Sequence, residues 1–353
     1  MPESPAIVAI YALTKQGASQ ARKLAKALPA SRLFLPRRLA GPHEEAFDKF
    51  TQALGERFQS FKGHVAFCAT GIAVRAIAPL INKKTDDPAV VVCDHHGHWA
   101  ISLLSGHLGG ANQLAREVAR ILGGETVITT GTDTEGLPSL EMAAKDLGLT
   151  IANLPALSHV SMALLEGERV RVYDPWGWLQ PVLKQRPELF ELLDQEPGPA
   201  EDDHPLVWVG WQTLSPGRKC LVLRPPCLAL GVGCNRGTPA DEIVQLIHQV
   251  LDKQGLEPKS IMCLASVQLK ADENGLIQAA RELGTKTIFF EPEQLAKVDV
   301  PNPSTVVQRH LGTSSVCEAA ALLAARGGPM LIDKQKSPNV TVAVALAPAS
   351  YGS

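Results

Sequence analysis

The chain has 353 residues, of which 45% are hydrophobic and 5% aromatic, and this supplies enough apolar material for more than one α/β-sized core. Its 34 Lys and Arg nearly balance its 36 Asp and Glu. This excludes the strong positive electrostatic field with which proteins bind nucleic acid or an anionic membrane. No apolar run approaches the roughly 20 residues that span a bilayer, and signal-peptide features are missing, so we expect a cytoplasmic protein that binds a small molecule.

Short apolar runs alternate with amphipathic stretches through the first part of the chain. This rhythm predicts βα units on a mainly parallel sheet. The predicted strands are 6–11, 63–68, 89–93, 99–104 and 126–129, and the predicted helices are 17–28, 71–81 and 111–122. We therefore expect an N-terminal α/β domain over residues 1–135.

The composition changes after residue 136, where four tryptophans and a polar, proline-containing stretch occur. We interpret 136–227 as a smaller middle α/β or α+β domain with a linker, ended by Pro225 and Pro226. A second βα rhythm follows, with strands from 228, over 260–265, 287–290 and 340–345, and helices over 239–251, 273–283 and 314–325. The sequence thus predicts two α/β domains with mainly parallel sheets, the second over 228–353, joined by the middle region.

A glycine-rich corner joins a predicted strand to a predicted helix over residues 102–112. Glycines permit close approach of a ligand to the backbone, and a helix start offers free N–H groups to a carboxylate or phosphate. Ser105 and His107 add a hydroxyl and an imidazole there. We expect this corner to bind a ligand, and the alternative is a tight turn in which His107 caps or packs. The candidate binding residues of the corner are Gly106, Gly109, Gly110 and Asn112.

Two further strand ends in the first domain carry polar groups. Thr70 and Gly71 begin a predicted helix and Arg75 follows one turn later, so Thr70 is a candidate helix cap and Arg75 a candidate partner for an acidic ligand group. Asp133 ends a threonine-rich segment and is a candidate general base. The alternatives at both places are simple helix capping and a surface arginine.

The second α/β domain has its own candidate anion site. Asn235 and Arg236 lie in a glycine string between a strand and a helix, where Thr238 is predicted as N-cap and Pro239 as the first helical residue. Ser266, Lys270 and Glu273 follow the next strand, and Lys270 is a candidate partner for a substrate carboxylate. The alternative is a solvated Lys270–Glu273 pair. A third polar set consists of Ser304, Ser315 and Glu318. Ser315 and Glu318 have the spacing of a capping box.

Cysteines and histidines give no metal-binding pattern. The seven cysteines lack a C-x-x-C pair, so we expect reduced, mostly buried thiols. His95, His96 and His98 lie close together, but no carboxylate cluster or cysteine accompanies them, and we interpret this segment as an exposed turn. No metal site is predicted.

Several segments together resemble the cobalt-precorrin-5A hydrolase family of the CbiG type, in matching order and spacing from about residue 60 to 346. The string from Ile101 to Asn112, ISLLSGHLGGAN, is the most specific of them. Residues 1–60 and the middle region resemble the family only loosely. The other segments that carry the resemblance are 71–79, 86–92, 128–133, 231–237, 265–270, 301–304 and 315–320.

The resemblance implies an enzyme of anaerobic cobalamin synthesis that needs no cofactor, because the corrinoid substrate itself carries the cobalt. Water opens a δ-lactone on ring A, and acetaldehyde leaves as cobalt-precorrin-5B forms. On this basis we assign His107 as general base or acid, with Ser105 and the Gly109 and Gly110 amides at the oxyanion. Arg75, Arg236 and Lys270 would hold substrate carboxylates.

Two other functions use the same anion sites. A non-catalytic corrinoid carrier would bind the ligand and return it unchanged, and an enzyme acting on a phosphate-bearing ligand would also use the helix starts. The expected partner is a corrinoid small molecule, with no nucleic acid and no membrane. A homodimer and transient contacts with neighbouring enzymes of the pathway are left open.

Overall fold

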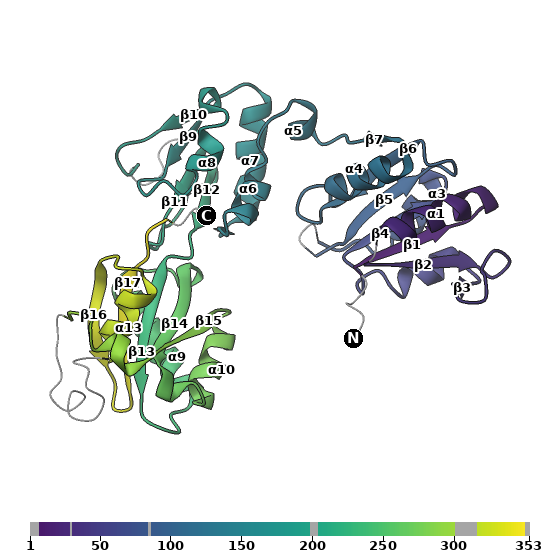
Figure 1. Ribbon diagram of the computed structural model, residues 1–353. Helices are drawn as coiled ribbons and strands as arrows, with labels where there is room; N and C mark the ends of the chain where they lie inside the picture. The colour runs from purple at the N-terminus through teal and green to yellow at the C-terminus, as the bar shows by residue number, and fades with distance from the viewer. Residues whose placement is uncertain (1–6, 29, 84–85, 198–203, 301–315, 350–353) are drawn as a thin grey trace. The chain divides into compact units, whose positions relative to one another are not determined.

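The computed structural model describes residues 7–28, 30–83, 86–197, 204–300 and 316–349 (Figure 1). It divides into two compact units, Met1–Met142 and Ala143–Ser353, each described here by itself. Three sheets with helices confirm the α/β fold class. Among the described residues, no helix is both long enough and apolar enough to cross a membrane.

The first unit is built on a seven-stranded sheet with the strand order β3-β2-β1-β4-β5-β6-β7. Its strands are β1 Val8–Ala12, β2 Ser31–Pro36, β3 Glu45–Phe47, β4 Gly63–Phe67, β5 Ala89–Cys93, β6 Trp99–Leu104 and β7 Glu125–Val127. Its helices are α1 Lys15–Ala27, α2 Phe50–Gly55, α3 Thr70–Ile77, α4 Ala111–Leu122 and α5 Gly131–Thr134, and α6 Leu140–Asp146 crosses the boundary between the units.

Helices cover both faces of this sheet because each helix has one apolar face. On one side, α1 and α4 bury Leu24 and Val118 against alternate strand residues such as Val65. On the other side, α2 and α3 bury Leu54 and Ile77. The short elements β2, β3 and α2, between the predicted helix and the predicted strand at 63–68, had no counterpart in the sequence prediction.

The last two strands of this sheet, β6 and β7, reverse the predicted direction. β5 and β6 are antiparallel, with Cys93 opposite Ala100 and Val90 opposite Leu104. Only five residues separate the two strands, and a parallel crossover needs a dozen or more. The glycine-rich corner after β6 therefore lies at the edge where β4 and β5 begin, away from the carboxyl ends of those two strands.

The second unit holds two five-stranded sheets, with the orders β10-β9-β11-β12-β8 and β15-β14-β13-β17-β16. The strands of the first are β8 Thr150–Ile151, β9 Val170–Tyr173, β10 Phe190–Leu192, β11 Leu206–Val209 and β12 Cys220–Arg224, with helices α7 Leu154–Leu165 and α8 Gln180–Leu183. Strands β13 Leu228–Cys234, β14 Ile261–Val267, β15 Lys286–Phe290, β16 Met330–Lys336 and β17 Val340–Leu346 form the second, with helices α9 Ala240–Lys253, α10 Asn274–Glu282, α11 Pro292–Leu295 and α13 Val316–Ala324.

Two predicted helix caps are wrong. Ala69 is the N-cap of α3, and Thr70 is already the first helical residue. Pro239 is the N-cap of α9, because its backbone is extended with ψ 149°, while the Thr238 hydroxyl donates to the Asn235 carbonyl. The segment with Ser304 and Ser315 lies outside the described residues, so the predicted capping box stays a prediction.

Candidate active site

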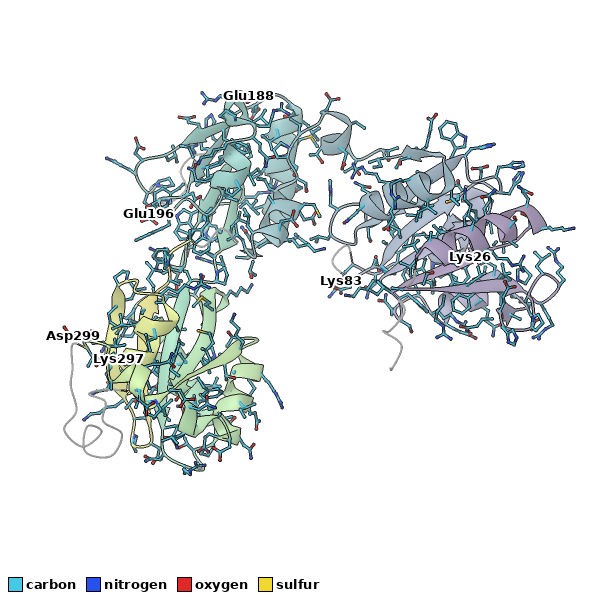
Figure 2. The ribbon with its side chains drawn as sticks, viewed as in Figure 1. Lys26, Lys83, Glu188, Glu196, Lys297 and Asp299 are labelled. Atoms are coloured by element: carbon cyan, nitrogen blue, oxygen red, sulfur yellow. The ribbon has the colours of Figure 1, made fainter. Side chains whose placement is uncertain are left out.

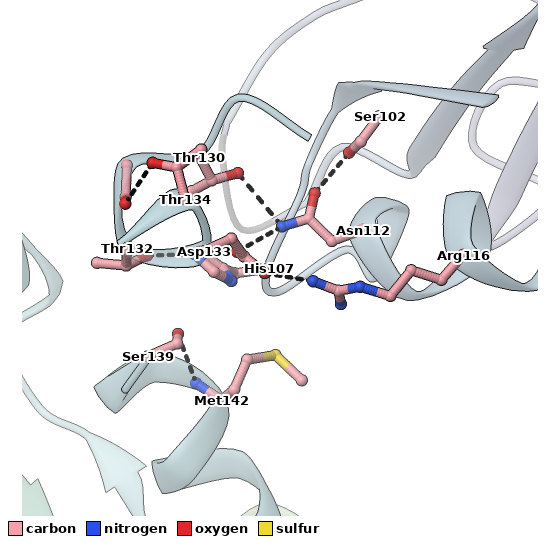
Figure 3. Close-up of polar contacts among 11 residues, drawn as sticks. Ser102, His107, Asn112, Arg116, Thr130, Thr132, Asp133, Thr134, Ser139 and Met142 are labelled. Atoms are coloured by element: carbon pink, nitrogen blue, oxygen red, sulfur yellow. Dashed lines mark hydrogen bonds and ion pairs between the residues drawn. The ribbon is translucent and has the colours of Figure 1, made fainter. Parts of the chain in front are cut away.

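A hollow of about 200 Å³ lies in the first unit beside the glycine-rich corner. Its wall includes His107, Asn112, Arg116, Asp133 and Ser139 (Figure 3). These residues come from the corner itself, from the first turns of α4, from α5 and from the start of the segment that leads into α6. Imidazole, guanidinium, carboxylate and hydroxyl groups thus share one small concave surface.

Asp133 is the centre of the polar network. Its Oδ1 lies 2.5 Å from Arg116 Nη2, and its Oδ2 accepts a hydrogen bond of 2.9 Å from Asn112 Nδ2. The same Oδ2 lies 3.5 Å from His107 Nε2. Because three groups contact one carboxylate that is only 17% exposed, Asp133 is held in place as a negative charge beside the imidazole.

The Nε2 side of His107 faces partners within the network. Nε2 makes a hydrogen bond of 3.1 Å with Thr132 Oγ1 in addition to its approach to Asp133. A proton on Nε2 leaves Nδ1 as the nitrogen with a lone pair. A histidine oriented by a carboxylate also occurs in the acyl-transfer triads, where the histidine acts as the general base. Chemically, the site can take a proton from water and return it to a leaving group.

Local folding explains why these residues meet. β6 and β7 are parallel, so the corner that follows β6 and the threonine-rich segment that follows β7 lie at the same edge. Asn112 and Arg116 are four residues apart on α4 and therefore point from one face of the helix. Asn112 also connects the two strand ends, since it accepts from Ser102 and donates to Thr130.

Three backbone N–H groups of the corner donate hydrogen bonds within the loop itself. Gly110 is left-handed, with φ 83°, and its N–H donates to the His107 carbonyl. The N–H groups of Ala111 and Asn112 donate to Ser105 and Gly106 carbonyls. The N–H groups at the start of α4 are thus bonded to carbonyls of the preceding loop. The predicted oxyanion role of the Gly110 amide does not fit this geometry, because that N–H already donates to the His107 carbonyl.

Ser105 has an unusual conformation. Its φ is +58°, which is rare for a residue with a side chain, and its Cβ packs so closely on Gly109 that a Cβ there would collide with it. Its hydroxyl is buried without a hydrogen-bond partner among the described residues. Such strain and an unsatisfied hydroxyl are features of functional sites, although Ser105 does not line the hollow.

Thr70, Gly71 and Arg75 lie away from this site. α3 follows β4, so these residues lie at the carboxyl edge of the sheet, opposite the edge with His107. The Arg75 guanidinium donates to the Gly71 carbonyl. They cannot bind the same small group as His107.

The predicted residues of the C-terminal sheet do come together, but mainly with one another. Arg236 Nη1 lies 3.0 Å from Asp272 Oδ2, and the buried Glu273 accepts from the Gly237 N–H and lies 3.4 Å from Lys270 Nζ. Lys270 is only 17% exposed, so the pair is not a solvated one. The adjacent hollow is lined by three carboxylates and by no Lys or Arg, which disfavours the predicted anion site.

Two other predicted residues also have structural partners. Ser266 is fully buried and donates to the Val232 carbonyl across the sheet. Asn235 donates to Asn339 on the β16–β17 turn. Ser266 therefore cannot contact a ligand in this conformation.

The histidine turn has no metal geometry. The rings of His95 and His96 are tilted, with centroids 4.2 Å apart, and those of His96 and His98 are stacked, with centroids 5.3 Å apart. All three side chains are exposed. In the described part of the chain, no group of three His, Cys, Asp or Glu side chains is arranged to hold a metal ion. All seven cysteines are free thiols, six of them buried.

Sequence reasoning missed Arg116, and it named the Thr132 segment without a role for Thr132. The signal for Arg116 was the helical period, since it lies one turn after Asn112 on the same face. Thr132 had no signal, because its contact with His107 depends on the pairing of β6 with β7.

Comparison with known proteins matches nearly the whole chain to one group. Three family models match in order: "Cobalamin synthesis G N-terminal" over residues 52–133, "Cobalamin biosynthesis central region" over 138–225, and "Cobalamin synthesis G C-terminus" over 228–345. A protein named cobalt-precorrin-5A hydrolase from Priestia megaterium is 32% identical over 360 residues, covering 96% of this chain and 95% of its own.

A second protein of that name, from Salmonella typhimurium, is 33% identical over 360 residues and covers 97% of this chain and 98% of its own. The crystal structure of a cobalamin biosynthesis protein G homologue from Sulfolobus solfataricus is 20% identical, covers 98% of both chains and has a TM-score of 0.36.

Proposed function

Since the chain belongs to the cobalamin synthesis G (CbiG) family, we propose that it is a cobalt-precorrin-5A hydrolase. The reaction opens the ring A δ-lactone of a corrinoid and releases acetaldehyde, leaving cobalt-precorrin-5B. The observation that carries the proposal is the imidazole of His107, held on one side by Asp133 and Thr132 in a small hollow.

In the first step, His107 acts as general base. Nδ1 takes a proton from water as the water oxygen bonds to the lactone carbonyl carbon, and the imidazolium that forms is stabilised by Asp133. Collapse of the tetrahedral intermediate breaks the bond between that carbon and the ring oxygen. The proton then passes from His107 to the departing alkoxide, which leaves a carboxyl group and a carbinol.

In the second step, the carbinol loses its hydroxyl proton and its C–O bond becomes a C=O bond. The bond between the former meso carbon and the macrocycle breaks, and its electron pair stays on the macrocycle carbon, which takes up a proton. The meso carbon and its methyl group leave as acetaldehyde. Water is the only co-reactant, so the proposal includes no cofactor, and the cobalt is part of the substrate.

The proposal also places the protein in the cytoplasm. Seven free thiols suit a reducing compartment. The near balance of 34 basic and 36 acidic residues supports a corrinoid partner and argues against nucleic acid or membrane.

The test is anaerobic incubation of the purified protein with enzymatically prepared cobalt-precorrin-5A, with assay of acetaldehyde and of product mass. Acetaldehyde released in step with lactone opening supports the hydrolase. Tight binding of a ligand whose mass is unchanged would overturn it in favour of a corrinoid carrier.

A further inference from the structure

A second hollow, of about 610 Å³, lies in the second unit where the middle sheet meets the C-terminal sheet. Lys259 and Lys286 line it together with Thr150, Pro226, Met262 and Leu283. Thr150 lies in β8, and the other residues lie where β14 and β15 begin and where β12 leads into β13. The hollow is thus at the opposite edge of the C-terminal sheet from the glycine string with Arg236.

Charge distinguishes this hollow from the other one in the same domain. Its lining includes two lysines and no Asp or Glu, whereas the hollow beside the glycine string includes three carboxylates and no Lys or Arg. Both lysines are exposed, and the ion pairs among the described residues include neither of them. An anionic ligand is therefore attracted to the hollow with Lys259 and Lys286 and repelled from the other.

The lining also has an apolar part. Pro226, Met262 and Leu283 contribute to it, and none of them carries a polar side-chain atom other than the thioether sulfur. A concave surface with apolar side chains and a few placed charges is typical of small-molecule sites. It fits a ligand that has a hydrophobic body and carboxylate arms.

Hydrogen bonds hold the connection between the middle sheet and the C-terminal sheet beside the hollow. Arg224 is 3% exposed, and its Nη1 donates to the Gly210 and Gln212 carbonyls. The N–H of Glu257 donates to the Trp211 carbonyl, so the loop after α9 is bonded to the end of β11. Because Thr150 pairs with Arg224, the wall of the hollow is fixed by the same contacts. A preformed site loses little entropy on binding.

We propose that the hollow lined by Lys259 and Lys286 binds the corrinoid, with the lysines on its acetate or propionate carboxylates and the apolar part against the edge of the macrocycle. The ligand class rests on the proposed function. The site itself is distinct from the residues around His107 and from the predicted residues Arg236 and Lys270.

The test is isothermal titration calorimetry of the full chain with cobyrinic acid, a stable corrinoid with free carboxylate arms. In the variant Lys259→Ala/Lys286→Ala, we expect affinity for cobyrinic acid to fall about tenfold, the scale of two partly screened charge contacts. The fully esterified corrinoid lacks the charges and is expected to bind both proteins equally. A matched control, Lys253→Ala/Lys297→Ala, removes two exposed lysines outside the hollow and is expected to bind like the wild type (Figure 2 labels Lys297).

Turnover of cobalt-precorrin-5A, run in parallel, separates this inference from the proposed function. Equal affinity of the double variant and the wild type for cobyrinic acid, with normal acetaldehyde release, would overturn the lysine site alone. Lysine-dependent binding without acetaldehyde release by the wild type would overturn the hydrolase and leave the site standing.

Discussion

Replacement of Asp133 by asparagine is the sharpest perturbation of the candidate active site. The shape is kept and the charge is lost, and the new amide would place an NH₂ group against a donor, Arg116 or Asn112. At 3.5 Å from His107 Nε2, a unit charge stabilises an imidazolium by about 5 kcal/mol at an effective dielectric of about 20, and by about 1 kcal/mol in bulk water.

The two side chains are 16% and 17% exposed, which favours a value between these limits, about 3 to 4 kcal/mol. Asp133→Asn should therefore lower kcat by about 10²- to 10³-fold, with a smaller change in KM. Acetaldehyde release in single-turnover mixtures measures this. Asp48→Asn is the control, because Asp48 is in an exposed ion pair with Arg37. A folded Asp133→Asn protein with kcat within threefold of the wild type would refute the role of the carboxylate.

Other variants test neighbouring parts of the account. Arg116→Ala should lower kcat only about two- to fivefold, because the Arg116 side chain in the ion pair with Asp133 is 56% exposed. A loss of kcat as large as that of Asp133→Asn would mean that Arg116 contacts the substrate. Burial lowers the pKa of His64 to about 4. Below pH 6.5 this histidine is therefore protonated in the unfolded chain while it stays neutral in the folded chain, which lowers the free energy of unfolding. Urea unfolding should show about 2 kcal/mol lost from this source between pH 7.5 and 5, and His64→Phe should remove that part of the loss. Gly231→Ala would drive a Cβ into the α13 backbone and should cost about 1 to 3 kcal/mol, whereas Gly55→Ala, which has room, should cost less; equal unfolding midpoints would contradict this packing.

The fold class followed from the sequence because strand and helix periods are local properties. The apolar run at 89–93 and the amphipathic stretch at 111–122 correspond to β5 and α4 of the structure. β2 and β3 were missed, because they are short and their residues do not form one continuous apolar run.

The site was predicted only in part, because the direction of β6 was not considered. The five-residue connection after β5 is too short for a crossover and indicated an antiparallel pair. With that direction, the sequence would have grouped His107 with Asp133 and separated both from Thr70 and Arg75. The partners of Lys270 and Arg236 had no such signal, because a contact with Glu273 or Asp272 depends on how the loops fold.

The most direct test of the account is a single turnover of cobalt-precorrin-5A in H₂¹⁸O, with mass analysis of the corrinoid product from the wild type and from His107→Gln. The account predicts one ¹⁸O in the newly freed ring A carboxyl group with the wild type, and almost no product on the same time scale with His107→Gln. An unlabelled carboxyl group, or equal rates for the two proteins, would contradict attack of water on the lactone carbonyl with His107 as its base.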